Sequence, residues 1–337
     1  MERPRLLMNV KPLPNILHEP EPVEVISTGK MRIPGIIEKE FTAGTLKDLG
    51  PIGCGSFGTV SKMLYLDAEI EMAVKRIRCQ NIPPKDQQRL LLEQSIIMNS
   101  SSPNIVQFYG VIFHEGDCWI CMELMTISLD RLYRYVYDEK HEYLSVNIIG
   151  HIAISMIDAL QYLKTHLKIM HRDVKPSNVL ISDNGEVKLC DFGICGELKD
   201  SIVRTHDIGC QPYLSPERLT KQEAGYGVGS DVWSLGITIL EITIGKFPYP
   251  EWTSPFEQLD FVVHGDPPVL PFSENRNYSV SLSNFINACL TKELQERPTY
   301  QELMTKEFYI QNTDCDGETR DQLVAYAREA LDFASNM

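Results

Sequence analysis

The sequence contains no apolar run that approaches the roughly 18 residues of a membrane-spanning helix. Its first residues, Met-Glu-Arg-Pro-Arg, lack the apolar core of a secretory signal, and Glu2 stands where a myristoylation site requires glycine. We therefore expect a soluble intracellular protein without a membrane partner. The expected location is the cytoplasm, with the nucleus as a second location to test.

Basic residues are few relative to acidic ones. The 337 residues include 32 Lys and Arg against 46 Asp and Glu, which gives a net charge of −14. Because nucleic-acid backbones attract Lys- and Arg-rich faces, this balance argues against a nucleic-acid partner. The hydrophobic fraction of 43% excludes a mostly disordered or fibrous chain. The length indicates two domains, or one domain with two lobes.

The cysteines give little support for a disulfide framework or a metal site. Nine is an odd number in a chain without a secretory signal. Cys118 and Cys121 have the CxxC spacing of a redox pair, but they lie in an apolar run that resembles a buried strand. Strand positions i and i+3 face opposite sides, so the two sulfurs cannot meet. No second pair completes a zinc site.

The chain divides into a tail, a β-rich part and a helical part. Residues 1–41 are interpreted as a flexible tail, because six prolines fall within residues 1–40 without sustained periodicity. Residues 47–79 alternate short apolar runs with Gly, as in antiparallel strands. A helix is expected at about 85–99, followed by strands at 106–111 and 118–125.

From about residue 147 the pattern changes to a helical period. Five apolar residues fall on one helical stripe: Ile149, Ile152, Met156, Leu160 and Leu163. The segment that begins at Val232 is apolar nearly all round, which indicates a buried helix. The expected fold is therefore α+β, with a small antiparallel β lobe that carries one helix and a larger, mainly helical lobe. The lobes meet near Met125.

A glycine-rich segment and a strand lysine are the first chemical candidates. Gly53, Gly55 and Gly58 have a spacing that lets backbone N–H groups approach phosphates, although glycines at this spacing also mark ordinary hairpins. Lys75 lies in an apolar strand, where it is costly to bury without an anionic partner. Glu93, on the expected helix, can supply that carboxylate. For each residue taken alone, a simpler alternative remains: Lys75 is a charge on an edge strand, and Glu93 is a solvated side chain.

Three further motifs decide between these alternatives. They are His171-Arg-Asp173-Val-Lys175-Pro-Ser-Asn178, then Asp191-Phe-Gly193, then Ser215-Pro-Glu217. Together with the glycine-rich segment and Lys75, in this order, they resemble the protein kinases. The resemblance implies a two-lobed kinase fold and transfer of the γ-phosphoryl group of ATP with Mg²⁺.

The resemblance also implies a role for each matching residue. Lys75 holds the α- and β-phosphates and is fixed by Glu93, while Asn178 and Asp191 hold Mg²⁺ through oxygen ligands. Asp173 accepts the proton of the incoming hydroxyl, and Lys175 offsets charge on the moving phosphoryl group. The residues expected to line the ATP site are Ile52, Gly53, Cys54, Gly55, Ser56, Phe57, Gly58, Thr59, Val60, Ala73, Lys75, Met122, Glu123 and Met125. Glu217 is expected to pair with Arg297.

Longer runs resemble one family of kinases. Phe41-Thr-Ala-Gly-Thr-Leu-Lys-Asp-Leu, Met72-Ala-Val-Lys-Arg-Ile-Arg and Cys118-Trp-Ile-Cys-Met-Glu-Leu-Met are similar to the mitogen-activated protein (MAP) kinase kinases. The chain leaves no room between Phe247 and Pro268 for the proline-rich insert of the growth-factor branch. It therefore resembles the stress-activated branch, which acts on Hog-type or Jun-type MAP kinases. The implied domains are the tail at 1–41, a catalytic domain at 42–311 and a C-terminal amphipathic helix at 312–337.

The resemblance implies partners and a switch. Ser201 and Thr205 match the family's activation-loop phosphorylation sites, modified by an upstream MAP kinase kinase kinase. In the tail, Arg3 and Arg5 precede Leu6 and Met8, an order that resembles the family's docking motif for the downstream MAP kinase. A stripe from Leu323 to Ala334 is either a docking segment for the upstream kinase or a helix packed on the large lobe.

Three classes of function remain open. The first is an active dual-specificity kinase, the second a pseudokinase scaffold and the third a small-molecule phosphotransferase. The intact set of Lys75, Asp173, Asn178 and Asp191 argues against the scaffold. The segment Gly209-Cys-Gln-Pro-Tyr213 resembles the peptide-positioning part of protein kinases, which argues against a small-molecule substrate.

Overall fold

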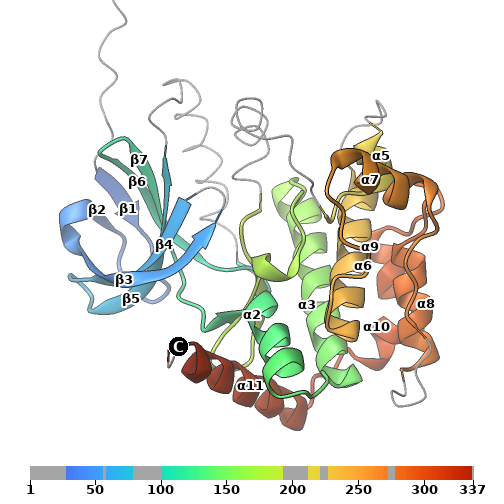
Figure 1. The fold of residues 1–337 in the computed structure, drawn as a ribbon. Helices are drawn as coiled ribbons and strands as arrows, with labels where there is room; N and C mark the ends of the chain where they lie inside the picture. Colours follow the sequence, from blue (N-terminus) through green and yellow to red (C-terminus); the bar gives the residue numbers. More distant parts are fainter. Residues whose placement is uncertain are drawn as a thin grey trace, which may run out of the picture.

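The chain forms a small β lobe and a larger helical lobe (Figure 1), as the sequence predicts. The computed structural model describes residues 28–55, 58–78, 101–192, 212–220, 227–271 and 278–335. The α+β fold class is confirmed. The helix expected at 85–99 lies outside the described residues.

The small lobe is built on a five-stranded antiparallel sheet. Its strand order is β3-β4-β5-β7-β6, with β3 at Leu46–Gly55, β4 at Gly58–Tyr65, β5 at Ile70–Arg78, β6 at Phe108–His114 and β7 at Asp117–Met122. Successive side chains of a strand point to opposite faces, so both faces of this sheet carry apolar residues. One face joins the main core of the molecule, and the other has a separate core.

The two cysteines of the CxxC spacing illustrate this division. Both lie in β7 and both are buried. Cys118 belongs to the main core, whereas Cys121 belongs to the core on the other face. The prediction that their sulfurs face opposite sides is confirmed. Within the described residues, no group of three or more His, Cys, Asp or Glu side chains could hold a metal ion.

Residues 28–41 are not part of a flexible tail. Strands β1 (Thr28–Met31) and β2 (Lys39–Thr42) pair antiparallel, and a short 3-10 helix, η1 (Ala43–Thr45), leads into β3. Met31 and Phe41 are buried in the second core of the small lobe. The backbone N–H of Arg32 also donates to the carbonyl oxygen of Tyr109 in β6 at 2.7 Å. The tail interpretation failed here because each strand has only four residues and is stabilised by tertiary contacts that a local pattern does not show.

The large lobe begins with a small sheet and continues as helices. Strands β8 (Ile127–Ser128), β9 (Val179–Ile181) and β10 (Val187–Leu189) form an antiparallel sheet in the order β10-β9-β8. The helices are α2 (Leu129–Arg134), α3 (Val146–Tyr162), α5 (Pro216–Leu219), α6 (Val228–Ile244), α7 (Pro255–Leu259), α8 (Val280–Cys289), α9 (Tyr300–Met304), α10 (Glu307–Gln311) and α11 (Gly317–Ser335). Short 3-10 or π-helical turns are η2 (Tyr135–Glu139), η3 (Leu163–Leu167), η4 (Pro176–Asn178) and η5 (Asp260–His264).

Helices α3 and α6 form the centre of this lobe. The Ser145 side chain caps α3 by accepting from the backbone N–H of Ile148. The predicted stripe is buried in full, and α6 is buried along nearly its whole length. The continuous helix Val146–Leu167 is long and apolar enough to cross a membrane by length and composition alone, but 67% of its most apolar window is buried inside the fold. This burial identifies it as a core helix of the large lobe.

Helix α11 returns along α2 and α3 (Figure 1). Leu323, Tyr326, Ala327 and Ala330 are buried. Tyr326 donates from its hydroxyl to Glu142 at 2.8 Å, and Gly185 lies so close to the helix that a Cβ there would meet Arg320 at 2.6 Å. The predicted amphipathic helix is therefore present. Its apolar stripe packs on the large lobe from Leu323 to Ala330, whereas Leu331 is exposed.

Candidate active site

The glycine-rich segment forms the hairpin between β3 and β4. Gly53, Cys54 and Gly55 pair with Val60, Thr59 and Gly58 in register. Gly58 has a φ of +153°, and a Cβ there would lie 1.8 Å from the carbonyl oxygen of Arg76. Only glycine allows β4 to approach β5 this closely. Ser56 and Phe57 lie outside the described residues.

Lys75 projects from the next strand. It pairs with Val60 in β4, and its side chain is 6% exposed. Its Nζ atom lies 2.7 Å from Oδ2 of Asp191, which comes two residues after β10. A buried ammonium is tolerated when such a charged partner is present. The predicted partner Glu93 lies outside the described residues, so the Lys75–Glu93 pair remains a prediction.

The predicted catalytic loop gathers two more side chains around Asp173. Asn178, at the end of η4, donates from Nδ2 to the backbone oxygen of Asp173 at 2.7 Å and to its Oδ2 at 3.1 Å. The Lys175 Nζ atom lies 3.0 Å from the same Oδ2 atom. The carboxylate is therefore held by an amide and an ammonium group, and its position and orientation are set before any substrate arrives.

His171 fixes the backbone of this loop. Its Nε2 atom is 3.0 Å from the carbonyl oxygen of Cys190, which can only accept, so Nε2 carries the proton. Nδ1 then carries no proton and accepts from the backbone N–H of Asp173 at 3.3 Å. Burial lowers the pKa of His171 below its ordinary value, which favours this neutral form.

A buried carboxylate on α6 supports the same loop. Asp231 accepts from the backbone N–H of His171 and from that of Arg172, both at 2.9 Å, and from the hydroxyl of Tyr300 at 3.1 Å. Arg172 has a φ of +67°, a left-handed conformation that a non-glycine residue adopts only when other contacts stabilise it. Asp231 supplies those contacts. The sequence interpretation did not single out this residue, although an acidic side chain in an otherwise apolar helix is a visible signal.

Phe192 links this loop to the small lobe. It is fully buried, and its ring lies edge-on to Phe108 of β6 at a centroid distance of 5.6 Å and tilted to His171 at 6.2 Å. Asp191, just before it, has a φ of +62°. This turn directs the carboxylate toward Lys75 while the neighbouring ring enters the core.

Comparisons with known proteins identify the family of this chain. Residues 46–309 match the family model of the protein kinase domain. The chain is 54% identical over 304 residues to MAP kinase kinase mkk-4 of Caenorhabditis elegans, covering 89% of this chain and 82% of that protein. This chain belongs to the MAP kinase kinases.

Two further relatives are dual specificity mitogen-activated protein kinase kinases. Sek-1 of Caenorhabditis elegans is 42% identical over 297 residues, with coverage of 88% of this chain and 86% of that protein. Hemipterous of Drosophila melanogaster is 38% identical over 282 residues, with coverage of 83% and 23%. The predicted resemblance to this family and the prediction of an enzyme, a dual-specificity kinase, are confirmed.

A kinase of this family uses ATP, and the residues brought together here fit that molecule. Gly53, Gly55 and Gly58 of the hairpin carry no side chains, and the positively charged Lys75 pairs in the sheet with Val60, which itself pairs with Gly53. Asp191 and Asn178 offer oxygen atoms, the ligands that Mg²⁺ prefers. When bound, ATP with a divalent metal supplies the phosphoryl group to be transferred.

The other predicted ATP-site residues lie along the strands of the small lobe and in the connector between the lobes, residues 123–126. Ala73 pairs with Met122, and both are buried, whereas Ile52 and Cys54 on β3 are exposed. The predicted residues Thr59, Val60, Glu123 and Met125 also lie in the described part of the kinase, in β4 and in the connector that follows β7.

The large lobe of the kinase contains two buried polar clusters. Arg297 donates to both oxygens of Glu217, at 2.9 and 3.1 Å, as the sequence predicts. The second cluster was not predicted: Glu241 of α6 accepts from the hydroxyls of Tyr133 at 2.6 Å and Tyr213 at 2.7 Å. Burial raises the pKa of Glu241, while the two hydroxyl hydrogen bonds act in the opposite direction.

Proposed function

We propose that this enzyme phosphorylates the activation loop of a stress-activated MAP kinase, of the Hog or Jun type, on both its Ser or Thr residue and its tyrosine residue. The observation that carries the proposal is the assembled set of Lys75, Asp173, Asn178 and Asp191. These four supply the charge, the metal ligands and the proton acceptor that phosphoryl transfer needs. The alternative, a pseudokinase scaffold, has no use for all four.

The residues have distinct roles in this proposal. Asp173 takes the proton of the incoming hydroxyl, and its carboxylate is already oriented by Asn178. Lys175 lies 3.0 Å from that carboxylate and offsets charge on the moving group. Lys75 places the α- and β-phosphates, and Asp191 with Asn178 holds Mg²⁺.

The switch is proposed to be phosphorylation of Ser201 and Thr205 by an upstream MAP kinase kinase kinase. Both residues lie outside the described residues. Each phosphate adds roughly −1.5 to −2 charges, which can order the loop against Arg172, beside the catalytic Asp173. A Ser201→Ala/Thr205→Ala variant is expected to show basal activity that the upstream kinase cannot raise.

Two docking segments are proposed on either side of the catalytic domain. Arg3, Arg5, Leu6 and Met8, outside the described residues, would capture the downstream MAP kinase through its acidic and apolar surfaces. The test compares the full chain with Arg3→Ala/Arg5→Ala, which should slow phosphorylation of the intact MAP kinase without changing ATP hydrolysis. For the upstream kinase, the exposed side of α11 is available, because its buried stripe is occupied by the large lobe.

The assay that tests the proposal uses the full chain, phosphorylated on Ser201 and Thr205, with ATP, Mg²⁺ and a panel of inactive MAP kinases of the Hog, Jun and growth-factor types. Incorporation of phosphate on both loop residues of a Hog- or Jun-type substrate supports it. Nucleotide binding without transfer to any substrate identifies a scaffold instead. Fractionation of cells tests the proposed cytoplasmic location and the nucleus.

A further inference from the structure

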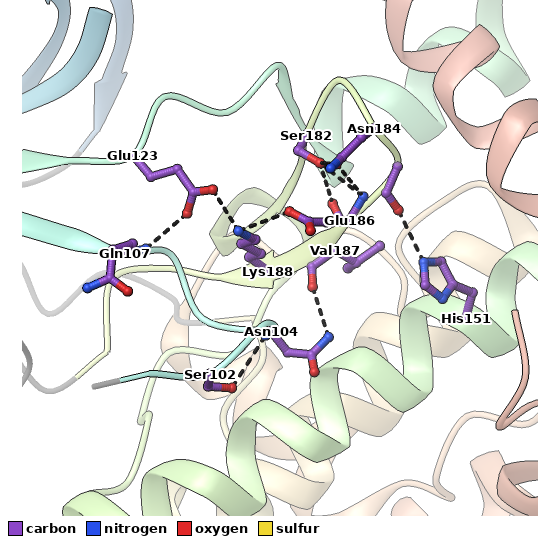
Figure 2. A network of polar contacts seen from close by, with 11 residues as sticks. Ser102, Asn104, Gln107, Glu123, His151, Ser182, Asn184, Glu186, Val187 and Lys188 are labelled. Atoms are coloured by element: carbon purple, nitrogen blue, oxygen red, sulfur yellow. Dashed lines mark hydrogen bonds and ion pairs between the residues drawn. The ribbon is translucent and has the colours of Figure 1, made fainter. Parts of the chain in front are cut away.

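Lys188 makes a polar contact that joins the connector to the large lobe (Figure 2). It lies on β10, three residues before Asp191. Its Nζ atom is 2.6 Å from Oε1 of Glu123 in the connector and 3.0 Å from Oε2 of Glu186. The Lys188 side chain is only 11% exposed and that of Glu123 21%, so this ion pair is better shielded from solvent than an ordinary surface pair.

Glu123 is held from a second direction as well. Its Oε2 atom accepts from the backbone N–H of Gln107 at 3.1 Å, and its own N–H donates to the Gln107 carbonyl oxygen at 2.9 Å. The two carboxylate oxygens therefore have different partners, one on the segment before β6 and one on β10. A side chain with both oxygens engaged has little rotamer freedom left.

The segment before β6 is itself attached to β10 (Figure 2). Asn104 donates from Nδ2 to the carbonyl oxygen of Val187 at 3.3 Å, and its backbone carbonyl oxygen accepts from the N–H of Leu189 at 2.9 Å. The backbone N–H of Val106 donates to the carbonyl oxygen of Leu189 at 3.0 Å. Residues 102–107 and the connector therefore both contact β10. Asp191 follows this three-residue strand by two positions.

We propose that Lys188 is a positioning residue for the nucleotide. Through Glu123 it fixes the connector against β10, so that the connector backbone and Asp191 keep a constant separation. The attachment of 102–107 to β10 is mostly through backbone groups. The connector also has backbone hydrogen bonds, from the N–H of Glu123 to Gln107 and from the N–H of Thr126 to Ile181, and the Glu123–Lys188 ion pair adds a direct side-chain link to β10. Removal of the Lys188 charge should therefore loosen the connector without unfolding the lobe.

The experiment measures nucleotide affinity and local motion in the full-length enzyme. Lys188→Met and Glu123→Gln are each expected to weaken binding of ADP with Mg²⁺, measured by calorimetry, by about tenfold, as when most of one charge-assisted hydrogen bond is lost. Glu123→Gln keeps the shape and can still accept from Gln107. Hydrogen exchange of the connector amides, residues 123–126, should become faster in both variants, while exchange in α6 stays unchanged.

A double variant and a matched control make the result specific. If the two residues act through each other, the double variant Lys188→Met/Glu123→Gln should bind ADP with the same affinity as either single variant. Glu186→Gln removes the other, more exposed carboxylate from Lys188, and it should change the affinity less than about twofold. Additive losses in the double variant, or unchanged affinity and connector exchange in Lys188→Met, would overturn the proposal.

Discussion

The backbone N–H of Arg172 lies 2.9 Å from Oδ1 of Asp231, and Arg172 has a left-handed φ of +67°. The second oxygen of Asp231 accepts from His171. A carboxylate in a buried helix therefore stabilises a backbone conformation that the catalytic loop would not adopt alone. The position of Asp173, one residue later, depends on this contact.

We predict that Asp231→Asn lowers kcat by about 10- to 100-fold, with a smaller change in the KM for ATP. An amide has only one acceptor oxygen, so one of the two backbone N–H groups becomes unsatisfied, at a cost of about 1–3 kcal/mol. Tyr300→Phe, which removes only the 3.1 Å hydroxyl contact to Asp231, serves as the control and should change kcat less. Equal kcat for Asp231→Asn and the wild type would contradict the role given to Asp231.

The catalytic assignment is tested by three substitutions. Asp191→Ala should abolish transfer because it removes a proposed metal ligand and a charged partner of Lys75. Lys75→Met should preserve the fold and misplace the phosphates, and Asp173→Ala should lower the rate by several orders of magnitude because it removes both orientation and proton acceptance. Rates are measured under saturating ATP together with melting temperatures. Near-normal turnover of any folded variant would remove that residue from the mechanism.

The buried pair between Glu217 and Arg297 is expected to contribute to stability. Arg297 also donates to the carbonyl oxygens of Gly229, Thr291 and Lys292. We predict that Arg297→Met lowers the free energy of unfolding by about 3–5 kcal/mol, because it leaves a buried carboxylate without its charge partner. Denaturant unfolding followed by fluorescence measures the change. A loss below about 1 kcal/mol, typical of surface pairs, would show that the pair is solvent-screened.

The same pair predicts a pH dependence of stability. Burial by itself raises the pKa of Glu217, but the hydrogen bonds and charge of Arg297 outweigh burial and lower the pKa below its ordinary value of 4.5. A carboxyl whose pKa is lowered in the folded state stabilises the protein above the pKa of the unfolded state, and this contribution is lost as the pH falls. The stability difference between wild type and Glu217→Gln should therefore shrink as the pH falls below 4.5 and through the lowered pKa of the folded state. A constant difference across this range would contradict the lowered pKa.

Local motifs in the sequence identified candidate residues that the structure places near one another. Asp173, Asn178 and Asp191 lie within short motifs whose spacing matches a known chemistry, and the structure brings them together with Lys75 from another lobe. The opposite orientation of Cys118 and Cys121 followed from strand geometry alone. The Glu217–Arg297 pair was predicted by its match to a family motif.

Supporting residues were harder to predict because their partners are distant in the sequence. Glu241 and Lys188 each look like an isolated charge, and only the fold places Tyr133, Tyr213 or Glu123 beside them. Strands β1 and β2 were missed for a related reason, since their burial depends on β6. Local sequence patterns identify candidate reacting side chains. The residues that hydrogen-bond to those side chains and orient them are brought close only by tertiary contacts.

Helix α11 is expected to act as a structural element of the large lobe. Leu323 is fully buried, Tyr326 donates to Glu142, and the Lys140 Nζ atom lies 2.7 Å from Oε2 of Glu329. Leu323→Ala should therefore lower stability by about 2–5 kcal/mol, and truncation after Cys315 should lower the melting temperature further. The control is Arg328→Ala, on the exposed side of α11, which should stay within about 0.5 kcal/mol of wild type.

The same variants separate packing from docking. If the upstream kinase docks on the exposed side of α11, Arg328→Ala combined with Asp321→Ala slows activation at unchanged melting temperature, since both side chains are exposed. Leu323→Ala, assayed below its melting transition, should then retain activation because that side chain faces the large lobe. Truncation that abolishes activation without lowering the melting temperature would instead show that the packing contacts contribute little, and would reverse the assignment made from the buried stripe.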